Sequence, residues 1–439
     1  MKNKNLLLLT ALSSSIGLMA AERPNIVLIM ADDLGYSDLS CYGNDYVNTP
    51  NIDRMAAEGV CLTDYHTNGS VSSPTRAALM TGRYQQRCGI TMVVSAANHR
   101  DVGLADEELT LAEAFKQCGY TTAIYGKWHL GYQPNFNPVN QGFDHFEGYV
   151  AGNVDYHSHL DLVNIHDWWC GTEQLREVGY TTDLITDKAV KFIEEHKDEP
   201  FFLYLPHEAP HNPLQGRNSP VQRYEEGQER PQKGDPSTIE AKSAKELYKE
   251  MIEVMDEGVG RVLETLEKSG LTENTIVIFT SDNGATKQGS NLPYRGTKST
   301  FYEGGHRVPA IVWSPAIKIS PSIPYTYDSP VIGMDLFPSL INLAGGKAPK
   351  NLDGVDFLSP LKKGKEMKSR DLFWGDEKGN YAMRRGDWKL VVKGEAIELY
   401  NLADDVAESR NLTSERPEIA AEMRAEVEQW LAEVTPTDK

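Results

Sequence analysis

The fold of this chain is decided by the stretch Asn25-Ile26-Val27-Leu28-Ile29-Met30, which runs into Ala31-Asp32-Asp33. An uninterrupted apolar run of this kind is typical of a parallel strand that is buried on both faces. Similar runs recur along the chain, at residues 121–125, 200–205, 275–280 and 308–313. The sequence therefore predicts a set of buried parallel strands, of which residues 25–30 form the first.

Segments with helical periodicity lie between these runs, at residues 49–58, 109–117, 181–195, 242–268 and 333–344. Strands that alternate with helices form open sheets with helices on both faces. We therefore predict a protein of the α/β class, with a large doubly wound mixed sheet flanked by helices.

The character of the chain changes after residue 345. Turn signals at Gly345-Gly346 and Pro349 precede a charged stretch over residues 362–370. Short strand-like segments and a closing helical pattern follow, at residues 372–374, 381–384, 388–392 and 417–432. We predict a main domain over residues 22–360 and a smaller C-terminal α+β subdomain, a small sheet plus a closing helix, over residues 361–439.

The first 21 residues have the layout of a secretory signal peptide. Lys2 and Lys4 give a positive start, residues 6–9 open a short apolar segment, and Ala20-Ala21 offers small residues for cleavage. The apolar segment is too short to cross a bilayer as a helix. We therefore expect residues 1–21 to be a signal peptide that sends the protein to the periplasm or out of the cell, with no membrane span.

The charge of the chain limits its partners. Its 44 Lys and Arg residues against 63 Asp and Glu residues give a formal net charge of −19. Proteins that bind nucleic acids present a basic face, so this balance argues against a nucleic-acid partner. An anionic substrate must be held by a local cluster of cations, because the field of the whole protein repels it.

Polar residues follow the predicted strands at their carboxyl ends, where open α/β sheets place their sites. Asp32 and Asp33 follow the first strand, and Asp282 and Asn283 follow the strand at residues 275–280. Three carboxylates and an amide oxygen make a hard oxygen site that suits Ca²⁺ or Mg²⁺. For Asp32-Asp33 alone, a solvated turn is an equal alternative.

A second informative stretch is Ser72-Ser73-Pro74-Thr75-Arg76, which continues to Thr81-Gly82. Five positions of this stretch form a pattern: Ser72, Pro74, Arg76, Thr81 and Gly82. At ordinary usage of roughly 5–8% per residue type, five fixed positions recur by chance on the order of once per million windows. A helix N-terminus explains the serine and the proline but leaves Arg76 and Thr81-Gly82 unexplained. A serine is a weak nucleophile at neutral pH, so a catalytic Ser72 needs a base or a change of chemistry.

This stretch fits Cys/Ser-x-Pro-x-Arg-x4-Thr-Gly, the signature of the type I sulfatases in the alkaline-phosphatase-like superfamily, and the chain resembles the serine type of that family. Further stretches resemble sulfatase motifs: Gly126-Lys127-Trp128-His129-Leu130-Gly131, Ala209-Pro210-His211, and Gly296-Thr297-Lys298 with residues 303–309. The resemblance covers residue 24 to about residue 412. It implies that residues 22–360 form the catalytic domain and that an anaerobic sulfatase-maturating enzyme converts Ser72 to formylglycine (3-oxoalanine).

The resemblance also assigns a metal site and a set of catalytic residues. It implies one Ca²⁺ ion, bound by Asp32, Asp33, Asp282, Asn283 and the modified side chain of Ser72. The nucleophile would be a hydroxyl of the hydrated formylglycine at that position. The charge around the nucleophile and the sulfate would be offset by Arg76, Lys127 and Lys298.

Two histidines would move the protons of the reaction. His211, together with Lys298, would protonate the leaving oxygen of the substrate. His129 would then take a proton from the second hydroxyl of residue 72, so that the aldehyde re-forms and sulfate leaves. Histidine suits both tasks because its ordinary pKa is about 6.5.

The substrate implied by local likenesses is a sulfated saccharide. Residues 148–159 resemble the corresponding stretch of N-acetylgalactosamine-4-sulfatase, and residues 50–59 are like galactosamine-6-sulfatases. These likenesses favour a sulfated Gal or GalNAc residue of a glycan. Lys127, His211 and Lys298 would bind its sulfate, and Asp155 and His159 are candidates for binding its sugar. Packing within a loop is the alternative for Asp155 and His159.

Other functions stay open from the sequence. A phosphoester hydrolase of the same superfamily would bind two transition-metal ions, and the extra histidine ligands are not found after the strands. A non-catalytic glycan-binding relative would be expected to have lost charged residues of the site. This chain keeps all ten residues that the resemblance assigns to catalysis and metal binding. A third alternative is an enzyme that stays inactive because Ser72 is not matured.

Overall fold

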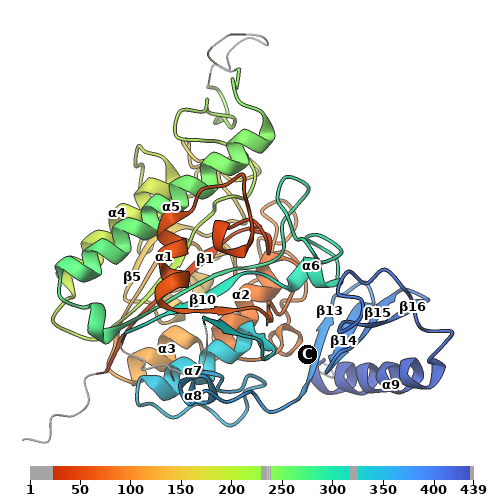
Figure 1. Cartoon of the computed structure of the whole chain (residues 1–439). Coiled ribbons are helices and arrows are strands. Elements are labelled where there is room, and N and C mark those ends of the chain that lie inside the picture. The colour runs from red at the N-terminus through yellow and green to blue at the C-terminus, as the bar shows by residue number, and fades with distance from the viewer. Residues whose placement is uncertain (1–22, 229–234, 236, 238, 316–324, 436–439) are drawn as a thin grey trace, which may run out of the picture.

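The computed structural model describes residues 23–228, 235, 237, 239–315 and 325–435 (Figure 1). The predicted signal peptide, residues 1–21, lies outside the described residues. In the part of the chain that the structure describes, no helix combines the length and the apolar character needed to cross a membrane.

A ten-stranded mixed sheet forms the centre of the molecule, in the order β11-β2-β10-β9-β1-β8-β4-β5-β6-β7. Its strands are β1 (Asn25–Ala31), β2 (Val60–Leu62), β4 (Thr121–Lys127), β5 (His145–Tyr149), β6 (Trp169–Cys170), β7 (Glu173–Gln174), β8 (Phe201–Pro206), β9 (Thr275–Ser281), β10 (Ala310–Trp313) and β11 (Thr326–Tyr327). β1 pairs in parallel with β8 on one side and with β9 on the other, and all three are buried along their length. The prediction of a mixed α/β sheet with a buried first strand is confirmed.

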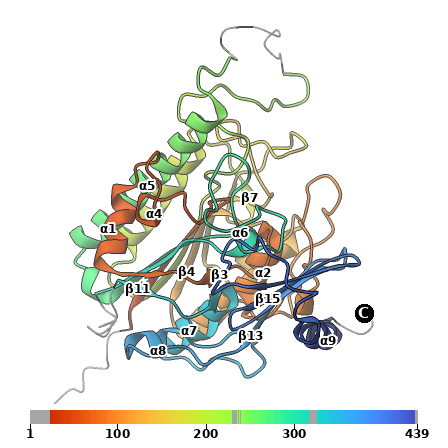
Figure 2. The ribbon, with the colours of Figure 1, turned by 45° about the vertical axis from the view of Figure 1, so that its right-hand side comes forward.

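Helices cover both faces of this sheet (Figures 1 and 2). One face carries α2 (Ser72–Thr81), α3 (Leu111–Gln117), α7 (Leu336–Leu343) and α8 (Leu358–Lys362), and the other carries α1 (Pro50–Glu58), α4 (Thr181–Glu195) and α5 (Ala244–Lys268). Side chains of β1 alternate between the two hydrophobic cores, with Leu28 in one and Ile29 in the other. This alternation is what the period of a strand requires.

One of the predicted parallel strands runs in the opposite direction. The apolar run at residues 308–313 becomes β10, which is antiparallel to both β9 and β2. The connection from β9 to β10 contains only the short helix α6 (Glu303–His306) and no long crossover helix. An apolar run reports burial on both faces and carries no signal for direction. The sequence also missed β2, β5, β6, β7 and β11, because strands of two to five residues carry too little pattern.

A smaller antiparallel sheet lies at the C-terminal end of the chain, in blue in Figure 1. It consists of β13 (Asp371–Gly375), β14 (Asn380–Arg385), β15 (Trp388–Lys393) and β16 (Ala396–Asn401), in that order. Helix α9 (Pro417–Val434) packs on it through a hydrophobic core of its own. The small sheet and closing helix match the predicted subdomain, and the boundary at residue 361 stays a prediction.

The remaining elements are short. β3 (Tyr65–His66) and β12 (Val331–Ile332) form a two-stranded parallel pair. Single turns of 3-10 helix lie at Ser40–Tyr42, Gln85–Cys88, Pro134–Phe136, Pro138–Gln141, Thr272–Asn274 and Gly333–Asp335.

Helix α2 carries the serine motif into the core, and all ten of its residues are buried. The helix stops at Gly82, whose φ of 66° is left-handed and whose N–H donates to the carbonyl of Ala78 at 2.9 Å. A Cβ atom at this position would lie 2.8 Å from the Cβ of Phe337. The glycine of the motif is therefore a helix stop that a larger residue does not fit. The other end of the helix places Ser72 at the carboxyl edge of the sheet.

Candidate active site

The structure brings all ten motif residues together at the carboxyl ends of β1, β4, β8 and β9, next to the first turn of α2. These residues are Asp32, Asp33, Ser72, Arg76, Lys127, His129, His211, Asp282, Asn283 and Lys298. The carboxyl ends of parallel strands meet at one edge of a sheet, which is why segments far apart in sequence meet here.

Four oxygen-bearing residues, Asp32, Asp33, Asp282 and Asn283, form the acidic part of the site and are at most 2% exposed. The Asn283 side-chain amide donates from Nδ2 to Asp33 Oδ1 at 2.7 Å. Asn283 Oδ1 is buried and accepts no hydrogen bond from any of the described residues. An unsatisfied buried oxygen is costly. Beside three carboxylates, this oxygen completes a donor set that fits a hard divalent cation such as Ca²⁺.

Three cations face these carboxylates. Burial alone would raise the pKa of Asp32, but the Lys127 ammonium holds the pKa of that carboxyl below its usual value. Burial lowers the pKa of Lys127 itself, against the pull of Asp32. The ion pairs are Arg76 with Asp282 at 2.9 Å, Lys127 with Asp32 at 2.5 Å, and Lys298 with Asp33 at 2.7 Å. Three positive and three negative groups balance, so an added divalent cation would leave a local positive excess for an anionic substrate.

Ser72 lies between these two sets of charges. Its hydroxyl donates to Asp32 Oδ1 at 3.3 Å and accepts from Lys127 Nζ at 3.3 Å. It is the first residue of α2, where the partial positive charge of a helix N-terminus favours a negatively charged oxygen. A nucleophilic oxygen at position 72 would therefore be stabilised by the Lys127 ammonium and by the N-terminus of α2.

His129 is held with one ring nitrogen free. Its Nε2–H donates to the carbonyl of Val94 at 3.1 Å, and its buried Nδ1 has no partner among the described residues. Burial and the neighbouring Lys127 ammonium hold the pKa of His129 well below its usual value. A neutral ring with a free Nδ1 can accept a proton. The Val94 N–H in turn donates to Ser73 Oγ at 3.0 Å, a link through the backbone that no sequence signal could have revealed.

His211 lies near the acidic residues of the group. Its Nε2 is 3.7 Å from Asp33 Oδ2, and its Nδ1–H donates to the carbonyl of Asn212 at 2.6 Å. Burial lowers the pKa of His211, while the carboxylates of Asp32 and Asp33 oppose that shift. The ring is placed to meet a group that enters the site from outside.

A cavity of about 90 Å³ opens at this group, and Ser72, His129, His211 and Lys298 all line it. Loop residues complete its wall, among them Val93, Tyr132, Asn153 and Leu162. The sequence analysis missed these wall residues, because they belong to no motif and come from loops whose paths local sequence does not define.

Asp155 and His159, the candidates for sugar binding, do not line this cavity, and both are at most 1% exposed. The Asp155 carboxylate accepts backbone N–H groups from its own loop and from residues 222 and 223. The His159 ring stacks on Trp168, with ring centres 4.5 Å apart. Their surroundings are those of packed loop residues, and the structure does not bring them to the predicted site.

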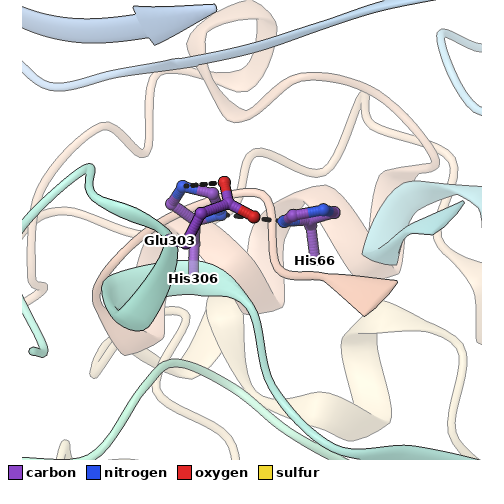
Figure 3. Close-up of side chains that lie close together, drawn as sticks. All are labelled: His66, Glu303 and His306. Atoms are coloured by element: carbon purple, nitrogen blue, oxygen red, sulfur yellow. Dashed lines mark hydrogen bonds and ion pairs between the residues drawn. The ribbon is translucent and has the colours of Figure 1, made fainter. Parts of the chain in front are cut away.

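A second cluster of potential metal ligands lies between the main domain and the C-terminal subdomain. His66, Glu303 and His306 are fully buried and lie close together (Figure 3). Lys389 of β15 already donates to Glu303 Oε1 at 2.6 Å and to His306 Nε2 at 2.8 Å. His66 Nδ1 lies 3.0 Å from His306 Nδ1, and one of the two rings donates a hydrogen bond to the other. With an ammonium already bound, this cluster is a contact between the two parts of the chain.

Fold and site together define a hydrolase of anionic esters. Residues 24–346 match the protein-family model described as Sulfatase. The chain is 33% identical over 406 residues to N-acetylgalactosamine-6-sulfatase of Mus musculus, which covers 86% of this chain and 74% of that protein. It is 34% identical over 419 residues to arylsulfatase A of Homo sapiens, with 86% and 76% covered. The chain belongs to the sulfatase family and is a sulfuric ester hydrolase.

A solved structure agrees with this assignment. The crystal structure of Ps i-CgsB in complex with k-i-k-neocarrahexaose is similar to this fold, with a TM-score of 0.82 and 29% sequence identity. The match covers 93% of each chain, so it includes both the main sheet and the C-terminal subdomain. The resemblance to the type I sulfatases is confirmed.

Proposed function

We propose that this protein removes sulfate from a sulfated saccharide, with a sulfated Gal or GalNAc residue as the favoured substrate. The observation that carries the proposal is the position of Ser72 Oγ, 3.3 Å from both Asp32 Oδ1 and Lys127 Nζ at the wall of the cavity. The names of similar proteins support the substrate class, since one is an N-acetylgalactosamine-6-sulfatase and another binds a neocarrahexaose. The predicted signal peptide is consistent with action in the periplasm or outside the cell.

The proposed chemistry depends on two additions to the chain. Conversion of Ser72 to formylglycine by an anaerobic sulfatase-maturating enzyme would supply a hydrated aldehyde as nucleophile in place of a weakly nucleophilic serine. Asp32, Asp33, Asp282 and Asn283 would hold one Ca²⁺ ion together with residue 72, and the ion would supply Lewis acidity to the sulfate. The unsatisfied Asn283 Oδ1 supports this ligand set.

The cations of the site would bind and orient the sulfate group. Lys298 lines the cavity, and Lys127 and Arg76 lie behind Ser72. Their positive charges would stabilise negative charge as it develops on the sulfuryl oxygens, and those of Arg76 and Lys127 are buried, where charge is screened weakly. Arg76 also keeps the Asp282 carboxylate in place through its 2.9 Å ion pair.

The two histidines, which both line the cavity, would handle the protons of the reaction. An anionic sulfate beside His211 favours its protonated form, which can give a proton to the leaving oxygen as the S–O bond breaks. His129 is neutral and has a free Nδ1, so it can accept a proton from a hydroxyl at residue 72. Over one cycle a water molecule is consumed, the sugar alcohol leaves with a proton, and sulfate is released.

The test of this function is a panel of monosaccharides that carry a 4-O- or 6-O-sulfate on Gal, GalNAc or GlcNAc. We expect sulfate release from Gal or GalNAc sulfates and little or no cleavage of the matched phosphate esters, measured by ion chromatography. Faster cleavage of the phosphate esters would identify a phosphoester hydrolase instead. Binding of the sugars without turnover by protein whose residue 72 is modified would identify a non-catalytic relative.

Calcium is expected to stabilise the folded protein through the acidic residues of the site. A ligand at a hundredfold excess over its Kd raises the free energy of unfolding by about 2.7 kcal/mol. We therefore expect the thermal midpoint of unfolding to rise when Ca²⁺ is added to metal-free protein. In Asp282→Asn, added Ca²⁺ should no longer raise the midpoint. Asp404→Asn, which changes an exposed carboxylate elsewhere, should keep the full response. An equal response in Asp282→Asn would place the ion at another site.

A further inference from the structure

Exposed apolar side chains gather at the mouth of the site cavity. Val93 and Leu162 line the cavity and are 38% and 59% exposed. Val163 and Ile165 belong to the same turn as Leu162 and are also exposed. Apolar residues that group around a functional cavity mark a surface that another molecule covers.

The turn that carries Leu162 is fixed relative to the cavity. The buried Asp161 carboxylate accepts two backbone N–H groups of this turn through Oδ1, each at 2.9 Å. Its Oδ2 pairs with Arg100 at 2.9 Å, and the Arg100 guanidinium lies 4.8 Å from the ring centre of Tyr132. Tyr132 is itself part of the cavity wall. Leu162 is thus held in a preorganised position, which lowers the ordering cost of binding.

The burial of the cavity lining places the sugar ring at this mouth. Ser72 and His129 line the inner part of the cavity and are at most 3% exposed, whereas Leu162 and Val93 line the part that is open to solvent. When the sulfate reaches Ser72, the ring that carries it therefore lies toward the open part, against Leu162 and Val93.

We infer that Leu162, supported by Val93, binds the apolar face of the sugar ring that carries the sulfate and selects a galacto-configured ring. The inference rests on the proposed function and names its selecting residue. In a galacto ring the axial 4-hydroxyl leaves the hydrogens of C3, C4 and C5 on one face, which is therefore apolar. In the gluco epimer the C4 hydrogen points to the opposite face, so a fixed apolar side chain has less to cover.

The test uses binding, so that it does not depend on turnover. In a Ser72→Ala background with Ca²⁺ present, calorimetry gives the Kd of GalNAc-6-sulfate, GlcNAc-6-sulfate and inorganic sulfate. We expect Leu162→Ala to weaken GalNAc-6-sulfate by about fivefold to tenfold, GlcNAc-6-sulfate by less than about threefold, and sulfate not at all. Leu162→Asn, of similar volume, should act like Leu162→Ala, because the contact depends on apolar character. In enzyme without the Ser72→Ala substitution, Leu162→Ala should raise KM for the GalNAc sulfate and leave kcat nearly unchanged.

The matched control is Leu292→Ala, which removes a leucine of similar exposure (69%) that does not line the cavity. It should change none of the three Kd values. An unchanged Kd for GalNAc-6-sulfate in Leu162→Ala, or an equal loss for sugar and sulfate, would overturn the inference while the proposed function stands. If the protein with Leu162 intact binds neither sugar sulfate more tightly than sulfate itself, the proposed function and the inference both fail.

Discussion

Ser72→Ala is expected to lower kcat/KM for a sulfated saccharide by about 10⁴-fold or more while the fold is kept. The variant has no hydroxyl that can be oxidised or can attack sulfur, and the surrounding cations cannot replace a nucleophile. The stability cost is small, about 1 kcal/mol, because the Ser72 hydroxyl makes only two long hydrogen bonds of 3.3 Å. Sulfate release measures the first effect and a urea titration the second.

Ser73→Ala is the matched control, since it removes the neighbouring buried hydroxyl, which accepts the Val94 N–H. We expect at most about a tenfold loss of activity in this variant, because only the position of His129 is loosened. Mass spectrometry of the mature wild-type protein should show the loss of two hydrogen atoms in the peptide with residue 72. Near wild-type turnover by Ser72→Ala, or an unmodified peptide in fully active enzyme, would contradict the proposed mechanism.

Lys389→Met is expected to cost about 3–5 kcal/mol of stability, because it leaves a buried carboxylate without its main partner. Lys389 and Glu303 are both fully buried, and their charged atoms lie 2.6 Å apart. The guanidinium of Arg307 remains 3.2 Å from Glu303 and compensates only in part. A urea titration measures the effect as a lower midpoint at an unchanged slope.

Lys393→Met is the control for this prediction, because Lys393 lies on the same strand and is exposed. Its ammonium lies 5.4 Å from the centre of the Tyr302 ring, and its replacement should cost less than about 1 kcal/mol. The double variant Glu303→Gln with Lys389→Met should recover part of the loss, because the uncompensated charge is gone. A cost below 1 kcal/mol for Lys389→Met alone would show that the buried pair contributes little.

The parts of the fold that could be predicted from sequence are those with long, regular patterns. β1 and β9 carry uninterrupted apolar runs, so their burial follows from residue type alone. Helix α4 was predicted with its observed bounds, residues 181–195, because its apolar residues recur at helical spacing. The direction of β10 could not be predicted, since direction depends on the path of the connecting loop.

The same distinction, between segments with a regular sequence pattern and segments without one, applies to the site. Asp32 and Asp282 could be placed together because each follows a buried strand, and the sheet itself gathers strand ends. The position of Leu162 depends on the contact between Asp161 and Arg100, which are 61 residues apart. Nothing in the sequence around either residue records that contact. Asp155, for the same reason, could not be recognised as an anchor of its loop.

The central position of β1 also affects when the sheet can form during synthesis of the chain. β1 pairs with β9, and roughly 240 residues separate the end of one strand from the start of the other. At about 5–20 residues per second, the ribosome completes β9 some 12–50 s after β1. Until then β1 cannot pair with β9, and the hydrophobic core that surrounds α2 is incomplete. An enzyme that modifies Ser72 would have to act before α2 is buried, so the rate of folding would help decide how many molecules become active.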